Sequence, residues 1–285
     1  MQKNTHLRAK LHARRFLFVL LYENKCAIMI LKRHRCDDAV MKGKSMKIIG
    51  SDYDGTFTCG GVTDEKLQAI AKWQAAGNKF GIISGRGGSF FAELKEQYPT
   101  LTLDFFAGCN GGYIMDGEGA VIYAAKFRSV SLVELVEDVF AFGCGWVHIH
   151  ADSSVTVKAD NPDFREAIPN WEGGFSQAAI WLPDENKTKE LANILSEKYG
   201  EFLTPLINGG CLDIVPKGVN KADGLLRVAR YFNCSRDNVI AVGDNINDID
   251  MLVAFPSYAM ASGKEEVQRL AGGVVADITE IFEKE

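Results

Sequence analysis

Residues 47–56 read KIIGSDYDGT, and this stretch decides the fold. The apolar run predicts a short strand that ends at Asp52. One residue then separates Asp52 from Asp54, and Gly55 permits a tight turn. Such a pair can divide the work of phosphoryl transfer, because one carboxylate can attack phosphorus while the other handles the leaving-group proton. A solvated turn is the alternative interpretation, because Asp and Gly are common in turns.

The pattern around this strand alternates between strands and helices. Apolar runs at 47–51, 80–83 and 103–107 predict strands, and helical spacing of apolar residues predicts helices at about 63–77 and 85–98. Short strands that alternate with helices predict parallel βαβ units with helices on both faces of a sheet. In such sheets, ligands bind beyond the carboxyl ends of the strands.

The pattern changes after residue 110. Tyr113–Met115 and Val121–Ala124 flank the sequence DGEG, which is typical of a hairpin. Further strands and helices of α+β type are expected as far as residue 208, and the strand and helix alternation resumes at Cys211–Val215. We therefore expect a Rossmann-like α/β domain made of residues 46–110 and 209–285, with an α+β cap at 111–208.

The first 45 residues differ from the remainder in charge. Residues 1–45 carry eleven Lys or Arg and three Asp or Glu, a net charge of +8, which leaves −13 on residues 46–285. The acidic remainder argues against nucleic acid as a partner. No run approaches the roughly 20 apolar residues of a membrane span. We expect this basic extension to be disordered, or Met46 to be the true start.

The chain has seven cysteines. They show no C-x-x-C pair and no spacing typical of zinc ligands. Scattered, reduced thiols are typical of a cytoplasmic protein, so a cytoplasmic location is expected.

A second motif follows the strand at 80–83. Ser84 stands at the strand end, and its hydroxyl can hydrogen-bond a phosphate oxygen. Gly85, Gly87 and Gly88 allow backbone N–H groups to approach an anion near a helix start. The alternative is an ordinary helix cap with loop glycines.

A lysine and an acidic motif occur later in the chain. Lys221 begins a predicted helix, where a cation needs an anionic neighbour, although Lys217 is a rival in the same loop. The sequence GDNIND at 243–248 follows a predicted strand, and Asp244, Asn247 and Asp248 cluster there. Several carboxylates at neighbouring strand ends repel one another, and Mg²⁺ suits carboxylate, water and phosphate oxygens.

In this order, the motifs resemble those of the haloacid dehalogenase (HAD) superfamily, and in particular its Cof-like phosphatase branch (type IIB) with a C2 cap. The matching features are DxDGT at 52–56, the strand-end Ser84, an insert, Lys221, and GDNIND at 243–248. The sequences CNGG at 109–112 and DIVPKGVNK at 213–221 also match the branch. The resemblance covers residues 46–285.

The resemblance implies a covalent aspartyl-phosphate mechanism. Asp52 is the expected nucleophile, and Asp54 is the expected acid for the leaving alcohol and then the base for water. Ser84 and Lys221 are expected to stabilise the transferred phosphoryl group. The family pattern places the functional lysine at 221 and leaves Lys217 as loop charge.

The resemblance also implies a Mg²⁺ cofactor and a set of substrate contacts. The expected metal-site residues are Asp52, Asp54 (through its backbone carbonyl), Asp244 and Asp248. The expected substrate-binding residues are Ser84, Gly85, Asn110, Lys221 and Asn247.

Asp54 narrows the reaction. Dehalogenases of the superfamily lack an acid two residues after the nucleophile, because a halide leaves without a proton. Hydrolysis of a small phosphorylated metabolite is therefore favoured, and in this branch it is usually a sugar phosphate. The alternatives are a phosphomutase of the same fold and a catalytically silent binding or regulatory relative. The presence of the nucleophile, the acid and the metal residues disfavours the silent relative.

Overall fold

The computed structural model describes residues 46–127, 130–151, 153–168 and 174–285. Residues 46–285 form one compact unit. The expectations for residues 1–45 lie outside the described residues. Among the described helices, none has both the length and the apolar character that crossing a bilayer requires.

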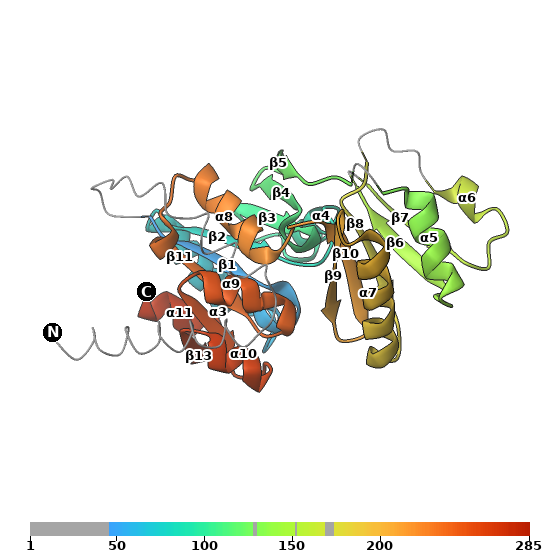
Figure 1. Cartoon of the computed structure of the whole chain (residues 1–285). Coiled ribbons are helices and arrows are strands. Elements are labelled where there is room, and N and C mark those ends of the chain that lie inside the picture. The colour runs from blue at the N-terminus through green and yellow to red at the C-terminus, as the bar shows by residue number, and fades with distance from the viewer. Residues whose placement is uncertain (1–45, 128–129, 152, 169–173) are drawn as a thin grey trace. The chain divides into compact units, whose positions relative to one another are not determined.

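Among the described residues, the larger sheet has eight strands in the order β13-β12-β11-β1-β2-β3-β4-β5. Figure 1 labels each of these strands except β12. These strands are β1 (Ile48–Ser51), β2 (Lys79–Ile83), β3 (Phe105–Gly108), β4 (Tyr113–Asp116), β5 (Val121–Ala124), β11 (Val239–Gly243), β12 (Ser257–Met260) and β13 (Gly273–Val275). The six strands from β13 to β3 are parallel, and β4 and β5 add to the edge in antiparallel fashion. The Rossmann-like parallel sheet is therefore confirmed.

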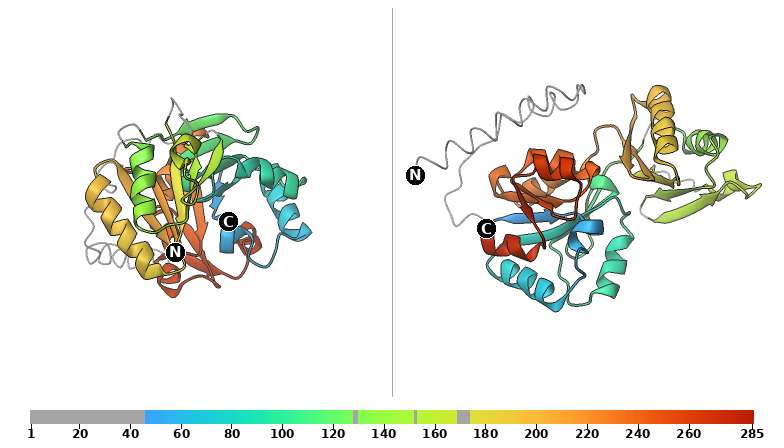
Figure 2. Two further views of the ribbon diagram at one scale, coloured as in Figure 1. Left: turned by 90° about the vertical axis from the view of Figure 1, so that its right-hand side faces the viewer. Right: turned by 90° about the horizontal axis from the view of Figure 1, so that it is seen from below.

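Helices of the described residues cover both faces of this sheet (Figure 2). One face packs against α3 (Asp64–Ala75), α4 (Phe90–Gln97) and α11 (Thr279–Lys284), and the other against α8 (Lys221–Tyr231), α9 (Ile249–Ala254) and α10 (Glu265–Leu270). Successive side chains of a strand point to opposite faces, so Ile49 joins the first apolar core and Ile48 the second. Both side chains are fully buried.

The smaller sheet has five antiparallel strands in the order β7-β6-β8-β10-β9. These are β6 (Trp146–His150), β7 (Ser154–Lys158), β8 (Gln177–Trp181), β9 (Leu203–Asn208) and β10 (Cys211–Pro216). Helices α5 (Leu132–Ala141) and α7 (Glu185–Tyr199) bury Leu135 and Leu191 in the same apolar core as Ile149. A short helix, α6 (Phe164–Ala167), follows β7. The expected α+β cap is present.

Two segments do not lie in the sheet that we expected: the hairpin β4–β5 was expected in the cap, and β10 was expected in the larger sheet. The hairpin β4–β5 extends the larger sheet, because Ile114 and Met115 are both buried, one in each of its apolar cores. The strand β10 belongs to the cap sheet, because the short Gly209-Gly210 turn folds it back on β9. By sheet membership, the cap strands therefore run from β6 to β10 rather than within 111–208.

Candidate active site

The site lies where three neighbouring parallel strands end. β1 is the middle strand of the three, between β11 and β2. Asp52 directly follows β1, Asp244 follows β11 and Ser84 follows β2. The backbone N–H of Asp52 donates to the Val242 carbonyl (2.9 Å), which continues the strand pairing up to the site. The topology thus brings together residues that are almost 200 positions apart in the sequence.

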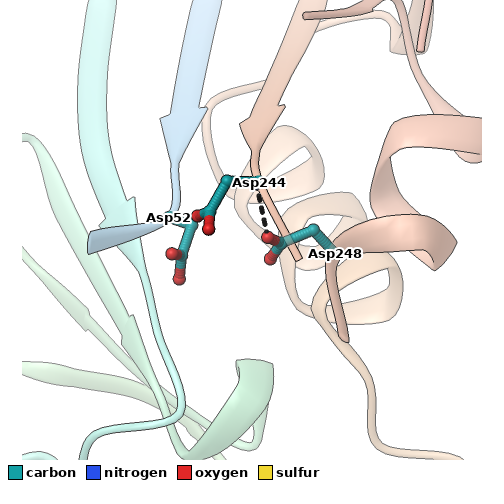
Figure 3. A group of neighbouring side chains, drawn as sticks. All are labelled: Asp52, Asp244 and Asp248. Atoms are coloured by element: carbon teal, nitrogen blue, oxygen red, sulfur yellow. Dashed lines mark hydrogen bonds between the residues drawn. The ribbon is translucent and has the colours of Figure 1, made fainter. Parts of the chain in front are cut away.

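Three carboxylates converge beyond these strand ends (Figure 3). Asp52, Asp244 and Asp248 each offer an oxygen, and these oxygens lie within 4.8 Å of one another. Asp248 is fully buried on the turn η4 (Ile246–Asp248), and its Oδ2 accepts from the backbone N–H groups of Asp244 (2.9 Å) and Asn245 (3.0 Å). The loop therefore holds the carboxylate of Asp248 in a fixed orientation.

Lys221 neutralises part of this charge. Its Nζ lies 2.6 Å from Oδ1 of Asp52 and 2.6 Å from Oδ1 of Asp248, and the side chain is buried. Burial alone disfavours the charged amine, but the carboxylates of Asp248 and Asp52 raise the pKa of Lys221 above its usual value. Lys217 is exposed in the preceding loop. Of the two rival lysines, Lys221 is therefore the one in the acidic cluster.

Burial and crowding affect the protonation of the acids. Burial raises the pKa of Asp52 to about 8, although Lys221 opposes the shift. Burial also raises the pKa of Asp244. Lys221 pairs with Asp52 and Asp248, whereas Asp244 accepts from Thr56 Oγ1, so among the described residues one lysine has to offset the charge of three acidic groups when they are ionised. An all-oxygen donor set of this size and charge fits Mg²⁺, which binds carboxylates at 2.0–2.1 Å.

Asp54 and Arg86 form an ion pair at the edge of the site. The guanidinium of Arg86 donates to both carboxylate oxygens of Asp54, at 2.8 Å each. The same guanidinium lies 4.2 Å from the ring centroid of Phe90. Asp54 is exposed, so its carboxylate stays accessible from solvent. Sequence reasoning did not assign Arg86 a function, although the residue directly follows the Ser84-Gly85 pair.

A backbone hydrogen bond joins Ser84 to Asn110. Ser84 is buried, and its Oγ accepts from the backbone N–H of Arg86 (3.2 Å). The backbone N–H of Asn110 donates to the Ser84 carbonyl (2.9 Å). Oδ1 of Asn110 is buried without a hydrogen-bond partner among the described residues. Gly85 follows Ser84, and a Cβ at its position would lie 2.7 Å from Oδ2 of Asp213.

A polar network joins these residues to the cap sheet. The amide nitrogen of Asn110 donates to Asp213 on β10 (2.8 Å), and Gln177 on β8 donates to the Gly85 carbonyl (2.7 Å). Burial raises the pKa of Asp213 to about 6. Sequence reasoning missed Gln177, and it identified Asp213 only as part of a motif.

The expected site residues therefore fall into two groups. Asp52, Asp244, Asp248 and Lys221 are in one contact cluster, and Ser84, Gly85 and Asn110 form a neighbouring group. Asn247 is half-buried on η4, between Asp244 and Asp248 in sequence. The carboxylate of Asp54 pairs with Arg86 and is not one of the three clustered carboxylates.

The family is established by comparison. A family model described as haloacid dehalogenase-like hydrolase matches residues 49–280, so the chain belongs to this family. The family is one of hydrolases, and the relatives described next are named as phosphatases. The resemblance inferred from the four motifs is thus confirmed.

Individual relatives agree with this assignment. The 5-amino-6-(5-phospho-D-ribitylamino)uracil phosphatase YbjI of Escherichia coli (strain K12) is 26% identical over 243 residues, covering 78% of this chain and 88% of that protein. The pyridoxal phosphate phosphatase YbhA of the same strain is 24% identical over 265 residues, covering 82% and 94%. The solved structure of the HAD subclass IIB sugar phosphatase BT4131 shares the fold, with a TM-score of 0.67, 21% identity, and coverage of 84% of this chain and 98% of that one.

Proposed function

We propose that the protein is a Mg²⁺-dependent phosphatase that hydrolyses a small phosphorylated metabolite through a phosphoaspartate on Asp52. The observation that carries the proposal is the convergence of Asp52, Asp244 and Asp248 with Lys221 beyond the strand ends. A carboxylate at such a position can act as the nucleophile in phosphoryl transfer.

The first half-reaction transfers the phosphoryl group to the protein. A carboxylate oxygen of Asp52 attacks phosphorus, and the bond from phosphorus to the leaving alcohol oxygen breaks. Asp54 gives its proton to that oxygen. Lys221 and Ser84 would stabilise the charge of the transferred group, and their position next to the strand end that carries Asp52 supports this role.

The second half-reaction restores the protein. Asp54 takes a proton from water, the water oxygen attacks the phosphorus of the phosphoaspartate, and the bond from phosphorus to the Asp52 oxygen breaks. Inorganic phosphate leaves, and Asp54 is again protonated for the next cycle. Exposure of the Asp54 carboxylate is compatible with this exchange of protons with water.

Asp52, Asp244 and Asp248, with the backbone carbonyl of Asp54, are the residues that would hold Mg²⁺. Bound there, the ion would supply positive charge that offsets the negative charge of the phosphoryl oxygens. It would also favour the ionised form of Asp52 against the effect of burial.

The substrate class is a small phosphorylated metabolite, and we favour a sugar phosphate. The similar proteins act, by name, on a phosphoribitylaminouracil, on pyridoxal phosphate and on sugar phosphates. These substrates share one phosphate monoester on a small polar or aromatic body. The substrate itself is best identified by a panel that includes all three kinds.

The test is release of inorganic phosphate from this panel, with MgCl₂ and with EDTA. We expect hydrolysis that depends on Mg²⁺ for at least one substrate. Asp52→Asn should abolish turnover, because it removes the nucleophile, while binding of Mg²⁺ by calorimetry persists. Full turnover by Asp52→Asn would remove Asp52 from its role. Isomerised sugar phosphate without free phosphate would indicate a mutase instead.

A further inference from the structure

Lys66 on α3 is a buried lysine outside the acidic cluster. Its side chain is 1% exposed, and lysine is seldom fully buried unless its charge is paired. Nζ donates to three backbone carbonyl oxygens, those of Phe57 (2.9 Å), Cys59 (2.8 Å) and Gly61 (2.9 Å). It also lies 3.1 Å from Oδ2 of Asp277. Four protein oxygens thus replace water around one ammonium group.

The three carbonyls belong to one loop, Phe57–Gly61, that directly follows the turn formed by residues 52–56, which we call the site turn. Gly60 and Gly61 in this loop have positive φ angles of 69° and 85°. A loop with two glycines has much conformational freedom in the absence of tertiary contacts. The ammonium group binds the carbonyls of alternate residues and so holds the loop in a single bent path.

This loop in turn supports the turn that carries the site residues. The backbone N–H of Gly55, next to Asp54, donates to Oγ1 of Thr58 (3.2 Å). The backbone N–H of Cys59 donates to the Thr56 carbonyl (3.2 Å), and Oγ1 of Thr56 donates to Oδ1 of Asp244 (2.6 Å). Hydrogen bonds therefore lead from the loop to Gly55, the residue directly after Asp54, and through Thr56 to Asp244.

We propose that Lys66 is a positioning residue whose buried ammonium, held by three backbone carbonyls and Asp277, fixes the loop Phe57–Gly61 and thereby the orientation of Asp54 and Asp244. Its catalytic readout rests on the proposed function. Lys66 does not touch the acidic cluster itself, so its effect passes through Thr58 and Thr56. An apolar residue in its place leaves three carbonyls without their donor.

The first test compares Lys66→Met with Lys72→Met, the matched control. Lys72 is exposed on the same helix. With p-nitrophenyl phosphate and MgCl₂, we expect Lys66→Met to lower kcat roughly 10–100-fold, the range seen when support behind a metal ligand is removed. KM should change little, because Ser84 and Lys221 come from other elements. Lys72→Met should keep the wild-type kcat.

The second test asks whether the charge and its N–H donors matter. Lys66→Ala leaves the oxygens in place around a space that a small amine can enter. Added methylammonium should restore kcat in a saturable manner, whereas tetramethylammonium, which has no N–H donor, should not. Loss of folding alone does not produce this difference. Equal effects of the two ions would overturn the role of the ammonium group.

A third measurement separates this inference from the proposed function. Amide hydrogen exchange at residues 55–61 should be faster in Lys66→Met than in Lys72→Met, whether or not turnover is measured. An inactive wild type would overturn the phosphatase proposal alone. Unchanged exchange in Lys66→Met, or unchanged kcat in an active enzyme, would overturn the positioning role. If Lys66→Met does not fold, Asp277→Asn replaces it, because this variant weakens one of the four contacts to the ammonium group. Exchange in the loop Phe57–Gly61 should again be faster than in the wild type. Unchanged exchange would overturn the positioning role of Lys66.

Discussion

At the scale of single residues, one position of the site turn, Gly55, does not accommodate a side chain. Gly55 has a φ of 81°, a conformation that side chains rarely adopt. A Cβ at this position would lie 2.7 Å from Oδ2 of Asp244. Gly55 is therefore required for two separate reasons, the backbone conformation and the approach of a proposed metal ligand.

Gly55→Ala should damage both stability and metal binding. We expect the free energy of unfolding to fall by about 1–2 kcal/mol from the backbone conformation. The displaced Asp244 should raise the Mg²⁺ concentration for half-maximal activity, roughly 10–100-fold. Urea unfolding and a Mg²⁺ titration of phosphatase activity measure the two effects.

Gly77→Ala is the matched control for this prediction. Gly77 has a φ of 87°, and a Cβ there would have nothing within 4 Å. It should lose similar stability and keep the wild-type Mg²⁺ dependence. The same Mg²⁺ shift in both variants would mean that instability, rather than contact with Asp244, is responsible.

At the scale of elements, the position of Lys221 depends on where α8 begins, because Lys221 is the first residue of this helix. Asn220 caps this helix, and its side chain accepts from the backbone N–H of Asp223 (2.8 Å). The cap fixes the direction in which the first helical residue leaves the loop. Since that residue is Lys221, the cap also determines whether Nζ reaches Asp52 and Asp248.

Asn220→Ala is expected to affect stability and activity together. Loss of the cap should cost about 1 kcal/mol in the free energy of unfolding. A misplacement near 1 Å can cost about 100-fold in rate, so kcat should fall by up to this factor. Thermal unfolding and steady-state kinetics are the measurements.

Ser131→Ala is the matched control, because it removes a helix N-cap that lies away from Lys221. Ser131 caps α5 in the cap domain, where its side chain accepts from the backbone N–H of Glu134. This variant should lose comparable stability without a fall in kcat. A normal kcat in Asn220→Ala would refute the link between the cap and Lys221.

At the scale of the whole described unit, contacts between the cap sheet and the loops that follow strands of the larger sheet lie next to the site. Besides Asn110 and Gln177, the Asn245 amide donates to Asn208 on β9. His150 on β6 is buried so closely against the loop after Ser84 that a Cβ at Gly87 would collide with its ring. Burial, with a smaller effect of His148, lowers the pKa of His150 to about 4.

This lowered pKa predicts that stability is lost in mild acid. The unfolded histidine has a pKa near 6.5, so between pH 6.5 and 4 the unfolded chain binds a proton that the folded chain does not. The contribution is fully present above pH 6.5 and is lost as the pH falls towards 4, by up to about 3 kcal/mol. Urea unfolding of wild type and His150→Gln from pH 7.5 to 4.5 should show a weaker pH dependence in the variant. Parallel curves would exclude His150 as a source.

Much of the architecture could be predicted from local pattern. The alternation of short apolar strands with helices reflects side-chain periodicity, which a sequence displays directly. It predicted the parallel sheet, the inserted cap and the strand-end positions of Asp52, Ser84 and Asp244. Strand pairing between distant segments is less visible, so β4, β5 and β10 were expected in the wrong sheets.

The candidate site divides in the same way. Asp52, Asp54, Asp244, Asp248 and Lys221 stand in short motifs, and the chemistry of each motif is readable from residue type and spacing. Arg86, Gln177 and Lys66 carry no such motif. Their partners lie in other segments of the chain, so only the folded structure shows what they contact.

The sequence by itself determined the family of this protein and the chemical groups that its motifs offer, because the residues of each motif are neighbours in the chain and their functional groups can be read in order. The tertiary structure alone decided which strands belong to which sheet, which carboxylates share Lys221, and which buried lysine supports the site turn. These are contacts between distant segments, and their geometry depends on how the whole chain packs rather than on any local pattern.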